Sequence, residues 1–342
     1  MELAIDALLQ ESNPVEKLGD AACYFPLANG RYEVKPGLIP FGTDFGNGVR
    51  DRHVFQLDAN FAHCRQMKQQ ARAEQLDKYV QTWNYSDAVA GAIAQFITQR
   101  LIQDHPNYFQ REARSDRNFN FHNQLTGETL ILNADYQLQQ ALSSHNEPTP
   151  PYSSALDALA MQIQEDLTVV SRSGGQHWVS AIHLCFPNYW AATEKIGKNF
   201  ATVHAPVAGM DAMNRRGDAI VNTMISRPPA VRFAWGLSTD TRLNHHPEPP
   251  PTVTRDRWQG RQFNPQNPRL YLRIERQVIW GLPHVDAALF SIRTYFRDCR
   301  QLKQDPGLRS CLIAALQSMS AEALVYKGLS ESRSAILAWL SE

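Results

Sequence analysis

The sequence predicts an α+β fold in which helices flank a five-stranded antiparallel sheet. In five segments between residues 167 and 296, apolar and polar residues alternate in the way typical of strands. A helical stretch separates the second segment from the third, and short connections join the last three, so neighbouring strands can pair antiparallel. We expect this core to span residues 151–300, with an N-terminal extension at 1–150 packed on it and C-terminal helices at 301–342.

The N-terminal extension is expected to begin with an irregular arm. Prolines and glycines recur through residues 1–50 and prevent long regular elements, while aromatic residues there indicate packing onto the body of the protein. Helices are predicted at residues 59–79 and 86–103, because apolar residues recur there at helical spacing. Residues 118–133 then predict a hairpin, and the serine- and proline-rich residues 141–151 predict a linker.

The core is predicted to open with a helix at residues 153–165 and a β-hairpin. The strands of the hairpin, Thr168–Arg172 and His177–Phe186, flank a Gly174-Gly175 turn. Glycine adopts the positive φ angles that two-residue hairpin turns require, so this pair marks the point where the chain reverses.

Helices are predicted after the hairpin. A short helix at residues 189–196 would end at Gly197, which suits a left-handed C-cap. Pro206 biases the residue before it away from helix, so we expect His204 at a helix end, where its side chain has a defined direction. An apolar stripe over residues 210–225 predicts the next helix.

Three further strands complete the predicted sheet, at Val231–Leu237, Arg269–Trp280 and Ala287–Phe296. Helices at residues 307–318 and 330–341 close the chain. Two strands, a helical segment and then three strands is the element order of a PAS domain, whose five-stranded sheet encloses a pocket walled by the central helices. The order therefore predicts a PAS-like core, although many α+β domains share it.

Composition narrows the class of protein. The 34 Lys and Arg residues balance the 34 Asp and Glu residues, so no basic field is expected to hold nucleic acid. The N-terminus lacks the features of a signal peptide, and no apolar run reaches the roughly 18 residues needed to span a membrane. Five scattered cysteines argue against a disulfide framework. We expect a soluble, cytoplasmic protein with free thiols that binds neither nucleic acid nor membranes.

Nine short motifs occur in one order between residues 164 and 329, and although each is weak alone, together they are specific. They are Gln164-Glu165-Asp166-Leu167, Phe186-Pro187-x-x-Trp190, Lys195-Ile196-Gly197-Lys198, Val203-His204-Ala205-Pro206-Val207, Arg232-x-x-Trp235, Glu275-Arg276-Gln277, Leu282-Pro283, Phe290-x-Ile292-Arg293-Thr294-Tyr295 and Tyr326-Lys327-Gly328-Leu329. With these motifs the sequence resembles the family of the haem-dependent oxidative N-demethylase alpha subunit, over roughly residues 35–340.

The resemblance implies a PAS-like pocket for haem b and the oxygen-dependent removal of a methyl group from a small amine, as formaldehyde. It also implies that separate flavin and iron–sulfur reductase subunits deliver electrons. The chain has no dinucleotide fingerprint and no iron–sulfur cysteine spacing, which agrees with a separate source of electrons.

His204 is the residue we expect to ligate the haem iron, because the motif at residues 203–207 surrounds it. The alternative is a buried histidine satisfied by a backbone hydrogen bond, which is a common role of a single histidine. His183 is the rival ligand, since it lies in a predicted strand among apolar neighbours. Cys185 is a weaker candidate, because no neighbour in the sequence would stabilise its thiolate.

Haem also needs cationic or hydrogen-bonding partners for its propionates. Arg232, Arg276 and Arg293 lie on three successive predicted strands and are candidates for this role. A structural ion pair is the alternative, because a guanidinium on an apolar strand face must be paired if it is buried. Trp235 is expected to line the haem slot, with ordinary core packing as the alternative.

The sequence does not predict other common kinds of site, because phosphate-loop, zinc-protease and nucleophile-elbow motifs do not occur in it. Three functions remain: a haem-dependent enzyme acting on an amine with dioxygen, a haem-binding sensor or carrier without turnover, and a PAS-like interaction module. No motif predicts which residues would be catalytic.

Overall fold

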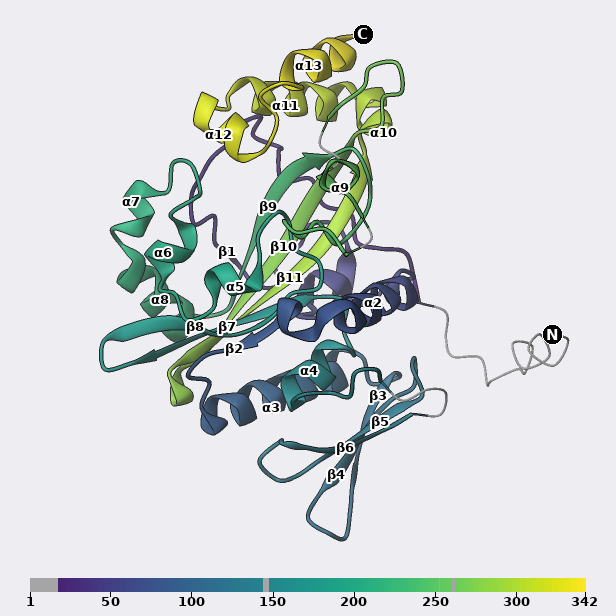
Figure 1. Ribbon diagram of the computed structural model, residues 1–342, viewed down its shortest axis with the longest axis vertical. Coiled ribbons are helices and arrows are strands. Elements are labelled where there is room, and N and C mark those ends of the chain that lie inside the picture. The colour runs from purple at the N-terminus through teal and green to yellow at the C-terminus, as the bar shows by residue number, and fades with distance from the viewer. Residues whose placement is uncertain (1–17, 144–147, 252, 260–261) are drawn as a thin grey trace, which may run out of the picture.

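The architecture comes from a computed structural model that describes residues 18–143, 148–251, 253–259 and 262–342. It is an α+β fold with two antiparallel sheets, one of seven strands and one of four, and helices pack on both faces of the larger sheet (Figure 1). The predicted single five-stranded PAS-like sheet is therefore wrong. Parts of the predicted arm and linker, residues 1–17 and 144–147, lie outside the described residues.

The larger sheet holds the five predicted strands in its middle and adds one short strand at each edge. Its order is β1-β9-β10-β11-β7-β8-β2. The bounds are β1 Ile39–Pro40, β2 Val80–Thr82, β7 Asp166–Ser173, β8 Gln176–His183, β9 Ala230–Ser238, β10 Tyr271–Leu282 and β11 Ala287–Asp298. Both edge strands come from the region predicted as an extension, so the N-terminal part of the chain completes this sheet.

The predicted turn between β7 and β8 is confirmed. Gly174 and Gly175 have φ angles of 56° and 77°, and the two strands pair on either side of them. Both angles lie in the region that glycine occupies without steric cost, which explains why this sequence reverses direction here.

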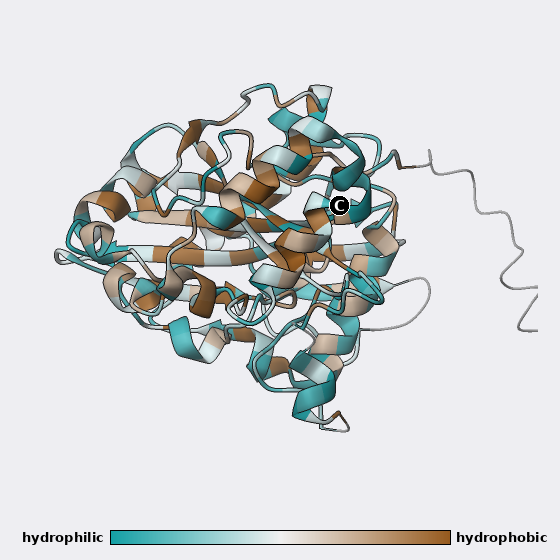
Figure 2. Cartoon of the chain, turned by 90° about the horizontal axis from the view of Figure 1, so that it is seen from above, coloured by the Kyte–Doolittle hydropathy of each residue, from teal (hydrophilic) through white to brown (hydrophobic). Residues whose placement is uncertain are grey.

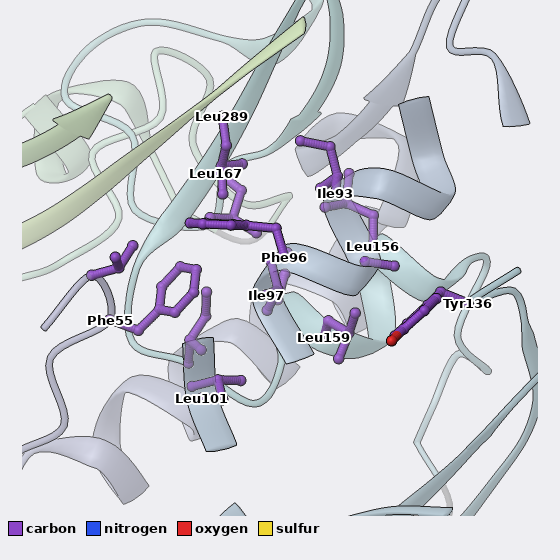
Figure 3. Packing of buried hydrophobic residues seen from close by; sticks show 14 of the residues in the cluster. Phe55, Ile93, Phe96, Ile97, Leu101, Tyr136, Leu156, Leu159, Leu167 and Leu289 are labelled. Carbon is purple, nitrogen blue, oxygen red and sulfur yellow. The ribbon is translucent and has the colours of Figure 1, made fainter. Parts of the chain in front are cut away.

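One face of the larger sheet packs on helices α2 (Phe61–Tyr79), α3 (Asp87–Asp104) and α4 (Ala155–Ala160). In Figure 3 the apolar side chains of α3, such as Phe96 and Ile97, lie between the sheet residues Leu167 and Leu289 and those of α4. The four-stranded sheet, in the lower part of Figure 1, packs on the same helices. Its bounds are β3 Phe109–Ala113, β4 Phe119–Asn123, β5 Glu128–Leu132 and β6 Leu138–Ser143.

The opposite face of the sheet is covered by short helices at the left of Figure 1. They are α5 Ala192–Lys195, α6 Phe200–His204, α7 Asp211–Asn214 and α8 Gly217–Ser226. The single helix predicted at residues 210–225 is thus two helices. Helix α8 approaches β10 at Gly281, where a Cβ would lie 2.1 Å from the carbonyl oxygen of Ile225, so only glycine permits this contact.

Helices near the C-terminus cover one end of the sheet (Figure 1). They are α10 Cys299–Gln304, α11 Pro306–Gln317, α12 Ala321–Tyr326 and α13 Arg333–Ser341, and the shorter helices are α9 Arg255–Gln259, η1 Gly48–Arg52 and η2 Pro283–Val285. Figure 2 shows hydrophobic residues along the strands and the helices over them, with hydrophilic residues on the outer turns. Among the described residues, no helix combines the length and apolar character needed to cross a membrane.

Candidate functional site

A cavity of about 420 Å³ lies between the larger sheet and the short helices α5 to α8. Strands β7 to β11 contribute to its floor, while α6, α7 and α8 and the arm residues 32–38 contribute to its walls. Its volume falls in the range of about 300 to 1,000 Å³ that is typical of small-molecule and cofactor sites.

The register of the strands decides which side chains face the cavity. Arg232 on β9 lies opposite Gln277 on β10, and Ala234 lies opposite Glu275. Because side chains of a strand alternate between the two faces of a sheet, these four residues share the cavity face. Apolar floor and wall residues surround this polar group, namely Val170, Ile279, Phe290, Ile292, Met210, Met213 and Met224.

His204 lies at the end of α6, as predicted, and lines the cavity, although Ala205 before Pro206 keeps right-handed helical angles. Its Nδ1–H donates a hydrogen bond of 2.8 Å to the carbonyl oxygen of Phe200, one turn earlier. Burial lowers the pKa of His204, and the charges of Arg232 and Lys195 lower it further, against the opposing effect of the Phe200 carbonyl. The imidazole is therefore neutral near pH 7, with its lone pair on Nε2.

A second histidine supports the residue to which His204 is bonded. The backbone N–H of Phe200 donates to Nε2 of His177 over 2.9 Å. This leaves the proton of His177 on Nδ1, which lies 3.2 Å from a carboxylate oxygen of Asp218. The chain from His204 through Phe200 to His177 therefore fixes both the position of α6 and the tautomer of His204.

Arg232 is a half-buried cation in the wall of the cavity. Within the described part of the chain it has no hydrogen bond or ion pair, and its Nε is buried without a partner. Burial lowers the pKa of Arg232, while the nearby charge of Glu275 raises it. A guanidinium left in this state favours an anionic ligand with carboxylate-like geometry.

Glu275 and Gln277 form a polar pair on the floor. The amide of Gln277 donates to one carboxylate oxygen of Glu275 over 3.0 Å, and the amide of Asn188 donates to the other over 3.2 Å. Arg273, which also binds the carbonyl of Phe186, lies 3.9 Å from Glu275. The Glu275 carboxylate is thus held in a fixed orientation beside the cavity.

Two lysines on the cavity wall, Lys195 and Lys327, have partners of their own. Lys195 donates to the carbonyl oxygen of Val203 over 2.6 Å, and Lys327 donates to that of Trp235 over 2.8 Å. Trp235 on β9 also lines the cavity, although alternation places it on the face opposite Arg232, and its ring meets Tyr32 of the arm edge-to-face at 5.7 Å. The arm therefore contributes an aromatic contact at the rim.

Arg276 and Arg293 do not line the cavity. They are paired across β10 and β11 and point to the opposite face of the sheet, where both are fully buried. Arg276 donates to the carbonyl oxygen of His53 over 2.9 Å, and Arg293 forms an ion pair of 2.6 Å with Asp58. Both guanidinium groups bind parts of the N-terminal region.

His183 and Cys185 also lie away from the cavity. His183 is fully buried, and its Nε2 lies 3.2 Å from Asp157, which binds Arg72 as well. Burial raises the pKa of the Cys185 thiol. Asp166, His183 and Cys185 place possible ligand atoms within 4.8 Å of one another, but both oxygens of Asp166 accept backbone N–H groups of residues 185 and 186. This cluster is closed by its own hydrogen bonds.

The structure thus brings His204, Arg232 and Trp235 together around one cavity and separates Arg276 and Arg293 from them. The sequence reasoning missed His177 and Gln277 as members of the site. Gln277 could have been found from the Glu275-Arg276-Gln277 motif, because alternation places its outer two residues on the face opposite Arg276. His177 carries no such signal.

In a comparison with known protein families, residues 47–337 match a family model. The matching family is described as "Haem-dependent oxidative N-demethylase, alpha subunit-like". The match includes every cavity-lining strand and helix named above and leaves out only the arm residues 32–38.

Proposed function

Because the chain belongs to the haem-dependent oxidative N-demethylase, alpha subunit-like family, we propose that it binds haem b in the cavity and removes a methyl group oxidatively from a small amine. His204 would ligate the iron. Arg232 would bind a propionate, and Trp235 would contact the edge of the macrocycle.

The hydrogen bond of His204 carries this proposal. A metal-ligating histidine nearly always donates its other ring N–H to a carbonyl or carboxylate, which directs the remaining lone pair toward the metal. The Nδ1–H of His204 is given to Phe200, and Nε2 has no hydrogen bond with any residue in the described ranges. This hydrogen bond therefore leaves the Nε2 lone pair of the cavity-lining histidine available to bind a metal.

Arg232 provides independent support. Arg232 is half-buried, and its buried Nε has lost hydration without a hydrogen bond to any described residue in its place, which is unfavourable. A carboxylate would restore charge-assisted hydrogen bonds at that position. Haem fits both requirements of this cavity, because it combines a large apolar surface with propionate groups.

The bound haem would supply the binding and activation of dioxygen, together with one-electron chemistry. The chain itself would hold His204 in place, exclude water with the apolar floor and helices, and orient the amine. Non-covalent haem b is favoured because the sequence has no Cys-x-x-Cys-His attachment motif. The description of the family as an alpha subunit fits electron delivery by a separate flavin and iron–sulfur reductase.

Two measurements on the purified protein test the proposal. Titration with hemin should give a Soret band that saturates at one haem per chain. With a chemical reductant, oxygen and a methylated amine, the haem-loaded protein should then release formaldehyde. Haem binding without formaldehyde from any small amine would favour a sensor or carrier, and no haem binding would refute the proposal.

A further inference from the structure

Residues 33–38 of the arm cross the side of the cavity between two fixed points, and we call them the strap. On its N-terminal side, the backbone N–H of Tyr32 donates to the hydroxyl oxygen of Ser318 over 2.8 Å. On its C-terminal side, β1 pairs with β9, and the N–H of Phe41 donates to the carbonyl oxygen of Pro229 over 3.0 Å. Both ends of the strap are therefore held by backbone hydrogen bonds to the body of the protein.

The strap itself has no hydrogen bond to that body within the described part of the chain. Its polar contacts stay inside the arm, where the carboxylate of Glu33 accepts hydrogen bonds from Asn29 and Lys35. Leu38 lines the cavity, yet it is 39% exposed. A segment with few buried apolar contacts and no backbone hydrogen bonds has low local stability, and moving lids are drawn from such segments.

One apolar contact joins the strap to the opposite wall. A Cβ placed on Gly209, between α6 and α7, would lie 3.7 Å from the Cβ of Val34. In Figure 1 the purple arm passes between α7 and β9 on its way to β1. Because strap residues line the cavity on one side and are exposed on the other, the strap separates the cavity from solvent.

A glycine supplies a point about which the strap can turn. Gly37 has a φ angle of 58°, and a Cβ placed on it would meet only atoms of Lys35 within 4 Å. The body of the protein therefore does not hold this residue in place. Hinges absorb changes of φ and ψ at a few residues near the end of an element, and Gly37 lies two residues before β1.

We propose that the strap is a lid that opens at Gly37 to admit haem into the cavity and then closes over it. This inference rests on the proposed function, since haem is the ligand that it names. A porphyrin is a rigid plane and has to enter the cavity whole. The sheet and the helices are held by their own packing, whereas the strap can move aside without breaking a hydrogen bond to the body. Once closed, it would keep water from the cavity.

A removable cross-link in the full chain tests the lid. Val34→Cys together with Gly209→Cys places two thiols at a Cβ separation suited to a disulfide. The free cysteines that are not buried, Cys23 and Cys311, would be replaced by serine. In stopped-flow measurements of the Soret band, we expect the oxidised form to bind hemin at least about tenfold more slowly than the reduced form, because the strap cannot open. Equal rates in the two forms, with the disulfide confirmed by mass spectrometry, would overturn the proposal.

Gly30→Cys together with Ala314→Cys is the matched control. A Cβ placed on Gly30 would lie 3.2 Å from the Cβ of Ala314, so this cross-link joins the arm to α11 outside the strap. Gly30 and Gly209 both have positive φ angles, so the two cross-links introduce the same kind of backbone strain. The oxidised and reduced forms of the control should bind hemin at the same rate. A slowing as large as that of the strap cross-link would show that the strap does not control entry, and would refute the lid.

Hydrogen exchange followed by mass spectrometry tests the strap without a cross-link. In the ligand-free wild-type protein the strap amides should exchange faster than those of β9, and saturating hemin should slow them by about tenfold or more. Strap amides as protected as those of β9 in the ligand-free protein, or unchanged by hemin, would refute the lid. If the wild-type chain binds no hemin at equilibrium, the proposed function fails, while exchange in the ligand-free protein still reports whether the strap opens.

Discussion

The two faces of the larger sheet carry the same kinds of polar residue in opposite states. On one face Arg276 and Arg293 are buried and bound to the N-terminal region. On the other face Arg232 has no partner in the described structure, and the oxygen of Gln277 has no donor. On the first face the terminal guanidinium nitrogens are bound within the chain, although Nε of Arg276 and Nε of Arg293 have no partner among the described residues. On the second face Arg232 has no hydrogen bond or ion pair within the described residues.

This difference shows how a buried charge can be assigned a role. A paired guanidinium with satisfied donors contributes to folding, and removing its partner is costly. An unpaired guanidinium beside a cavity has a cost that folding alone does not explain, so it indicates binding. The type of residue does not separate these two cases, because Arg232, Arg276 and Arg293 are all arginines on neighbouring strands. Their partners in the structure separate them.

The largest change in stability is expected from Arg293→Met, on the face of the larger sheet that packs on α2 to α4, here called the closed face. This change leaves the Asp58 carboxylate buried without its cation, which should lower the free energy of unfolding by about 3 to 5 kcal/mol. Urea denaturation followed by circular dichroism would measure it. The double variant with Asp58→Asn should recover part of the loss, and an unchanged midpoint in the single variant would show that the pair is not structural.

A smaller effect, on hemin affinity instead of stability, is expected from Arg232→Met on the face that borders the cavity, here called the open face. Hemin affinity should fall about tenfold because a charge-assisted bond to a propionate is lost. The free energy of unfolding should change by less than about 1 kcal/mol, since no internal partner is left behind. Arg300→Met, at an exposed arginine paired with Asp298, is the control and should change neither quantity. A large loss of stability in Arg232→Met would show that Arg232 is a structural residue like Arg293, and would contradict the difference between the two faces.

The smallest effect should come from His177→Leu. This change removes the acceptor for the N–H of Phe200, so the carbonyl that orients His204 becomes less fixed. Hemin affinity should fall about threefold, less than for a direct partner of the ligand, and the reduction potential of the bound haem should shift. His177→Gln retains an acceptor and should restore much of both values. If the reduction potential of the bound haem in His177→Leu equals that of the wild type, then His177 serves only to accept the N–H of Phe200 at the start of α6.

Much of the local structure could be predicted from the sequence. Alternating apolar residues located β7 to β11, and the glycine pair located the turn between the first two. The two edge strands could not be predicted, because they are two and three residues long and pair only through long-range contacts. The PAS-like expectation failed for this reason, and because the second sheet contains two strands beyond the predicted hairpin.

The candidate site shows a similar limit. The motif around His204 located a residue that lines the cavity at a helix end, but the expected cause is wrong, because Ala205 before Pro206 keeps right-handed helical angles of φ −52° and ψ −37°. The arginines required the strand register, which the sequence does not contain. Once Gln277 is paired with Arg232, and Arg276 with Arg293, the side of the sheet on which each acts is settled.

The most direct test of the account is hemin titration of His204→Gly, with and without added imidazole. We expect the variant to lose the wild-type Soret band and to regain it when imidazole occupies the space left by the side chain. The matched variant His183→Gly, at the closed face, should keep the wild-type band without imidazole. A wild-type spectrum for His204→Gly alone would contradict the assignment of His204 as the ligand of the iron.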